Sequence, residues 1–145
     1  MVEDTATRDA MVDLNNTDRE GVAADAALDA GCLAELRALD PEGKAQLVQR
    51  VLATYLGSLG KLAAQLRVAR QGADWDQVSR AAHTLKSSSA SVGALGLSAL
   101  CAEIERLLRA GDSAAAGPTL DRFDAEVQRV DAAVARTLAT LEAAA

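Results

Sequence analysis

The stretch around the only histidine of this sequence reads Ala82-His83-Thr84-Leu85-Lys86-Ser87-Ser88-Ser89-Ala90, and Gly93 follows shortly after it. At about 100° per residue, an α-helix through this stretch gathers its mostly apolar side chains on one stripe. The stripe consists of Val78, Ala82, Leu85, Ser89 and Val92. His83 falls about 140° from the stripe and Lys86 about 80°. The pattern therefore predicts an amphipathic helix that presents His83 to solvent among small and polar side chains.

An exposed histidine with these neighbours suits phosphoryl chemistry. Imidazole is a nucleophile near neutral pH because part of it is unprotonated. Small neighbours let another protein come close, and a lysine one turn away can offset the charge of a phosphoryl group on the ring. We therefore identify His83 as the candidate phosphoacceptor and Lys86 as the candidate charge-stabilising residue. The alternative is an ordinary solvated histidine and lysine without a chemical role.

The run from His83 to Ala94 resembles the signature of histidine-containing phosphotransfer (HPt) domains, which reads roughly His-x-Leu-Lys-Gly-Ser-x-x-x-x-Gly-Ala. In this resemblance His83 takes the place of the phosphoacceptor and Lys86 that of the neighbouring lysine. Leu85 takes the core position, and Gly93 with Ala94 the turn into the next helix. The sequence departs from the pattern at Ser87, where the family most often has glycine.

The resemblance implies a phosphorelay intermediate. It would accept a phosphoryl group on His83 from a receiver-domain aspartate and pass it to another response regulator. The implied partners are receiver domains and a hybrid histidine kinase. The chain itself would be a monomer. It would need no cofactor or metal of its own, because the receiver brings the magnesium ion. The candidate docking residues around His83 are Ser79, Arg80, Ser87 and Ala90.

Length and composition favour a single helical domain. Of the 145 residues, 50% are apolar but only 2% are aromatic, which suits helices packed through small side chains. The sequence has no convincing strand pattern, no apolar run long enough to span a membrane and no secretory signal. We therefore expect a cytoplasmic protein in which Cys32 and Cys101 are reduced core residues.

The net charge of −6 is concentrated at the N-terminus, since residues 1–29 contain eight acidic and two basic residues. The remainder is balanced, so neither part has the basic excess that nucleic-acid binding needs. We expect residues 1–26 to form an acidic, mobile leader and residues 27–143 to form the helical domain.

Apolar side chains recur at threes and fours along that domain. The spacing predicts helices at about residues 27–39, 41–71, 75–91, 94–110 and 113–142. Asp40 and Asp74 are the expected N-caps of the second and third helices, with Pro41 as the first residue of the second. Four long amphipathic helices with short connections predict an all-α fold, an antiparallel up-down-up-down four-helix bundle with a short extra N-terminal helix.

Two other functions remain open. One is a non-catalytic four-helix adaptor, in which His83 is incidental and the surface around it binds a signalling partner without phosphotransfer. The other is the dimerising phosphoacceptor bundle of a histidine kinase, although such segments usually have an acid where this sequence has Thr84. A zinc site is disfavoured because Cys32 and Cys101 lie on core stripes, away from His83. Kinase activity is not expected, because the sequence has no Walker-type phosphate loop.

Overall fold

The computed structural model describes residues 27–44 and 46–144, and these residues form five helices and no strand. The helices are α3 (Ala30–Ala38), α4 (Leu47–Gln71), α5 (Trp75–Ser91), α6 (Leu95–Arg109) and α7 (Ser113–Ala144). The predicted acidic leader, residues 1–26, lies outside the described part of the chain.

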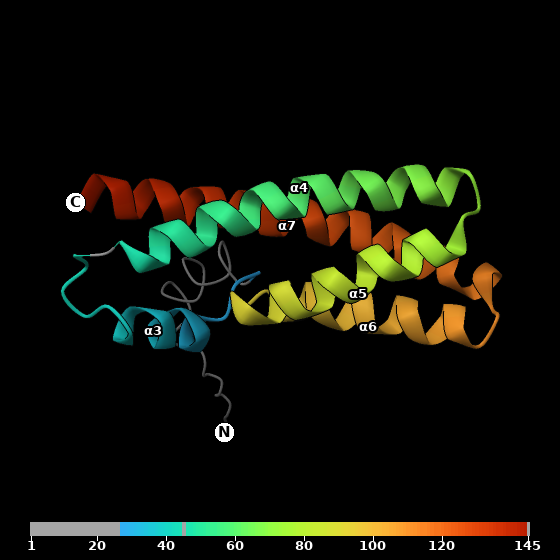
Figure 1. Ribbon diagram of the computed structural model, residues 1–145, viewed down its shortest axis with the longest axis horizontal. Helices are drawn as coiled ribbons and strands as arrows, with labels where there is room; N and C mark the ends of the chain where they lie inside the picture. Colours follow the sequence, from blue (N-terminus) through green and yellow to red (C-terminus); the bar gives the residue numbers. More distant parts are fainter. Residues whose placement is uncertain (1–26, 45, 145) are drawn as a thin grey trace, which may run out of the picture.

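The four long helices form an antiparallel bundle (Figure 1). Each one packs against the next in the chain, and contacts between α7 and α4 close the bundle. Figure 1 shows α4 and α7 as the upper pair and α5 and α6 as the lower pair. The short helix α3 contacts α4 and lies beyond the end of α5. The predicted all-α architecture, with a short extra helix before an up-down-up-down bundle, is therefore confirmed.

The core lies between these four helices and consists mainly of aliphatic side chains. Its largest fully buried members are Leu52, Leu59, Leu66, Val78, Leu85, Val92, Leu97, Ile104, Leu120, Phe123 and Val130. Each such side chain stabilises the fold by about 1.5–3 kcal/mol relative to exposure. The whole predicted stripe of α5 is buried, including Ser89, whose hydroxyl makes a 2.8 Å hydrogen bond with the hydroxyl of Tyr55. The orientation of α5 predicted from helical periodicity is therefore confirmed.

Local sequence fixes both ends of α5. The Asp74 carboxylate accepts a hydrogen bond from the backbone N–H of Gln77, which is the predicted N-cap. At the other end, Gly93 has a φ of 85°, in the left-handed region that favours glycine. Its carbonyl accepts a 2.7 Å hydrogen bond from the backbone N–H of Asp29. Asp29 in turn caps α3 by accepting from Cys32 N–H, so this turn ties α3 to the end of α5.

The predicted start of the second helix is wrong. We expected a helix from residue 41 with Asp40 as its N-cap, whereas α4 begins at Leu47. Gly43 and Gln46 have φ values of 71° and 52°, which a right-handed helix cannot contain. Asp40 still contacts the start of α4, because its carboxylate accepts a 3.1 Å hydrogen bond from the backbone N–H of Leu47, the first residue of the helix.

Candidate functional site

His83 lies in the middle of α5 on the side away from the core. Its side chain is 69% exposed, whereas Ala82 and Leu85 beside it are fully buried. The predicted exposure of His83 is therefore confirmed. The ring shares a shallow surface hollow with Ser79, Arg80, Thr84 and Glu105.

Glu105 of α6 holds the ring from one side. Its carboxylate is only 8% exposed, and Oε2 lies 2.8 Å from Nδ1 of His83. The other oxygen, Oε1, is buried and lies 2.7 Å from Nζ of Lys86. We regard this second contact as an ion pair, since no hydrogen bond of good geometry reaches Oε1 within the described residues. One buried carboxylate thus contacts both predicted residues of the site.

The charge of Glu105 determines which nitrogen of His83 is free. Burial raises the pKa of Glu105, but Lys86 and His83 together outweigh burial and bring this pKa below its usual range. Glu105 is therefore ionised at neutral pH, and a carboxylate without a proton only accepts hydrogen bonds. The Nδ1–H of His83 must donate to Oε2. In the neutral ring this leaves the lone pair on Nε2, the nitrogen not bonded to Glu105.

The structure gathers only some of the predicted site residues at the ring. Ser79 and Arg80 line the hollow with His83, and Lys86 reaches the same site through Glu105. Ser87 and Ala90 are exposed but do not line this hollow. They lie one and two turns further along α5, so they belong to the surface beyond the ring rather than to its immediate contacts.

Sequence reasoning missed Glu105. It lies 22 residues from His83, and only the side-by-side packing of α5 and α6 brings the two together. A signal was nevertheless present, because Glu105 is a carboxylate on the same stripe as Cys101, Ile104 and Leu108. Burying a charge is unfavourable unless it is paired, so a charged residue among core positions predicts an oppositely charged or hydrogen-bonding partner nearby.

The two cysteines are free thiols in the structure. Cys101 is buried in the core as predicted, and burial raises the pKa of its thiol to about 12. Cys32 is only partly buried at the start of α3, so its predicted core position is wrong. Neither cysteine contacts His83 through any hydrogen bond or ion pair found in the described part of the chain.

Fold and site together define a helical bundle that presents one histidine, oriented by a buried carboxylate, to solvent. Residues 50–133 match the family model of the Hpt domain, so the chain belongs to the Hpt domain family. Hpt domains are phosphotransfer intermediates rather than kinases, and they interact with receiver domains and kinases in phosphorelays. The family therefore assigns this chain a general role in histidine phosphotransfer.

A solved structure supports the fold. The chain is similar to histidine-containing phosphotransfer protein B (HptB) from Pseudomonas aeruginosa PAO1, with a TM-score of 0.69 and 23% sequence identity. The match covers 78% of this chain and 95% of that one. A search of curated protein sequences found no match. Among the residues that the structure describes, no helix is both long and apolar enough to cross a membrane.

Proposed function

We propose that His83 is the phosphoacceptor of a multistep phosphorelay. It accepts a phosphoryl group from the aspartate of one receiver domain and passes it to a second response regulator. The single observation that supports this proposal best is the contact between Nδ1 of His83 and the ionised carboxylate of Glu105. This contact leaves Nε2 with its lone pair, on an exposed ring that a partner can approach.

The proposed step is an in-line displacement at phosphorus. The lone pair of Nε2 forms the N–P bond while the P–O bond to the receiver aspartate breaks, and the aspartate leaves as a carboxylate. The ring keeps its proton on Nδ1 and gains a positive charge, which the adjacent Glu105 carboxylate stabilises. Return transfer to a second receiver reverses these bond changes, so no additional reactant is needed.

Lys86 has two tasks in this proposal. In the structure its ammonium pairs with Glu105, which keeps that carboxylate ionised and in place. With its side chain 36% exposed, the same ammonium is also available to offset charge on the phosphoryl group. The receiver supplies the magnesium ion that holds the acyl phosphate, and the chain needs no cofactor of its own.

The proposed docking residues are Ser79, Arg80, Ser87 and Ala90, which are small or cationic and lie along α5 near His83. We expect a monomer that works in the cytoplasm with receiver domains and a hybrid histidine kinase. Ser87 is small enough to allow close approach, so Ser87→Gly should be tolerated.

The test is transfer from a panel of phosphorylated receiver domains to the wild type and to His83→Gln. We expect acid-labile, base-stable label on the wild type only. The variant should keep its helix content in circular dichroism, because the replaced ring is exposed. Label on His83→Gln would contradict the assignment of His83. Absence of label from every receiver on a well-folded wild type would favour the adaptor function instead.

A further inference from the structure

A groove on the surface of α7 begins at Ala27, the first residue that the structure describes. Its volume is about 380 Å³. The α7 groove is lined by Ala27, Ala125, Gln128, Arg129, Ala132 and Arg136. The members from α7 lie three, four, seven and eleven residues after Ala125, so they share one face of the helix. Small alanine side chains therefore form much of the floor of this groove.

The two charged residues among this lining are both arginines. Arg129 and Arg136 are exposed and lie seven residues apart, which is about 10 Å along the helix. Arg129 donates a 2.6 Å hydrogen bond from Nη1 to the carboxylate of Glu126. A guanidinium has five N–H groups, so Arg129 can bind a second acceptor as well. The α7 groove thus suits a chain segment that combines small side chains with acids.

The residues directly before the groove have this chemistry. Residues 18–26 read Asp18-Arg19-Glu20-Gly21-Val22-Ala23-Ala24-Asp25-Ala26. They combine small side chains with three acids and one base. Residues 1–26 as a whole contain seven acidic and two basic residues. The leader and the α7 groove are therefore complementary in charge.

The chain enters the α7 groove at Ala27, so the acidic segment is tethered to it. Asp25 lies two residues before Ala27 and Glu20 lies seven residues before it. At no more than about 3.6 Å per residue, Glu20 reaches up to about 25 Å from Ala27, which exceeds the separation of the two arginines. Exposed ion pairs are weak, so a separate acidic peptide would bind poorly. A short tether raises the effective concentration into the millimolar range and favours the chain's own segment.

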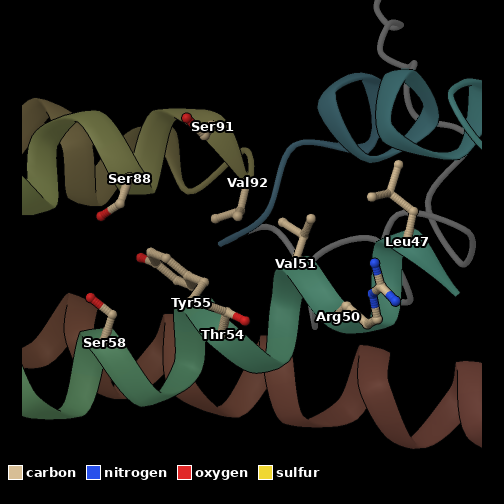
Figure 2. A pocket seen from close by; sticks show the side chains of 9 residues that line it. All are labelled: Leu47, Arg50, Val51, Thr54, Tyr55, Ser58, Ser88, Ser91 and Val92. Atoms are coloured by element: carbon tan, nitrogen blue, oxygen red, sulfur yellow. The ribbon is translucent and has the colours of Figure 1, made fainter. Parts of the chain in front are cut away.

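A second groove suits this segment less well. It lies between α4 and α5 and is lined by Leu47, Arg50, Val51, Thr54, Tyr55, Ser58, Ser88, Ser91 and Val92 (Figure 2). Figure 2 shows Arg50 at the end near Leu47, away from Ser58. Arg50 is the only charged residue among the described residues that line it, and Ala27 does not belong to them. This groove therefore offers one cation where the α7 groove offers two, and the chain does not enter it.

We propose that residues 18–26 of this chain dock in the α7 groove, with their acids beside the two arginines and their small side chains on the alanine floor. This inference is independent of the proposed phosphotransfer. The helix α7 packs against α4 and α6, whereas α5 presents His83. The docked segment therefore leaves the histidine exposed to a partner. It also restricts the expected mobility of the leader to residues 1–17.

Limited digestion of the full chain with trypsin, which cleaves after arginine and lysine, tests this inference. The leader has Arg8 outside the docked segment and Arg19 inside it, and an acid follows each of them. Mass spectrometry measures both cleavage rates, and the rate after Arg8 is the reference within the same molecule. Arg136→Glu should raise the ratio of cleavage after Arg19 to cleavage after Arg8 about fivefold. High salt should raise the same ratio in the wild type, because it screens the ion pairs.

Arg122→Glu is the matched control. Arg122 is exposed on α7 seven residues before Arg129, but it is not among the residues that line the groove. The ratio should therefore stay within about twofold of the wild type. Circular dichroism checks that both variants keep their helix content.

Two results would overturn the inference. One is the same cleavage ratio in the wild type, Arg136→Glu and Arg122→Glu, because the arginine of the groove would then hold nothing. The other is a wild-type ratio that changes with protein concentration, because the segment would then occupy the groove of a second copy.

Discussion

Glu105 is the residue on which the proposed chemistry of His83 depends. It accepts a hydrogen bond from Nδ1 through one oxygen and pairs with Lys86 through the other. Because its pKa is lowered, its negative charge persists at neutral pH and opposes the positive charge that develops on the ring during transfer. Periodicity could identify His83 and Lys86, which share one helix, but it could not show that Glu105 of a different helix contacts them both.

Replacing Glu105 by glutamine should slow phosphotransfer about tenfold. The amide keeps a hydrogen-bond acceptor near Nδ1 but loses the charge, and charge assistance is worth about 1.5 kcal/mol or more. Glu103→Gln is the matched control, because Glu103 lies on the same helix and pairs with Arg106 instead. Single-turnover transfer from one receiver measures both variants. Equal rates for Glu105→Gln and the wild type would show that Glu105 has no part in the reaction.

At the scale of elements, periodicity predicted the helices well and their ends less well. It placed α5 at its observed bounds, because Asp74 and Gly93 are strong local signals at its two ends. It placed the start of α4 too early, at residue 41, whereas this helix begins at Leu47. The left-handed conformation of Gln46 could not be predicted, since glutamine has no preference for it.

Gly93 joins three elements, because its turn between α5 and α6 also holds the start of α3. A Cβ at this position would lie 3.0 Å from the backbone N and O of Asp29 and from Cβ of Cys32. Gly93→Ala should therefore lower the free energy of unfolding by the strain of its positive φ and by the displacement of α3.

Gly111→Ala separates these two effects. Gly111 has a similar φ of 77°, but a Cβ there would meet nothing within 4 Å. We expect Gly93→Ala to lose about 1–2 kcal/mol more than Gly111→Ala in urea unfolding. Faster amide exchange in α3 should accompany that loss. Equal losses in the two variants would mean that the contact with Asp29 contributes nothing to stability.

For the whole molecule, the apolar spacing of the sequence predicted the bundle, because four long helices with short connections have few ways to bury their stripes. What the sequence left open depends on which helices become neighbours. The packing of α5 against α6 creates the contact between His83 and Glu105.

The most direct test of this account is nitrogen NMR of the imidazole ring before and after phosphorylation. The chain has a single histidine, so the ring signals belong to His83 without ambiguity. We predict that neutral His83 is protonated at Nδ1 and that the phosphorus of the labelled protein couples to Nε2. Coupling of phosphorus to Nδ1, the nitrogen held by Glu105, would contradict the account.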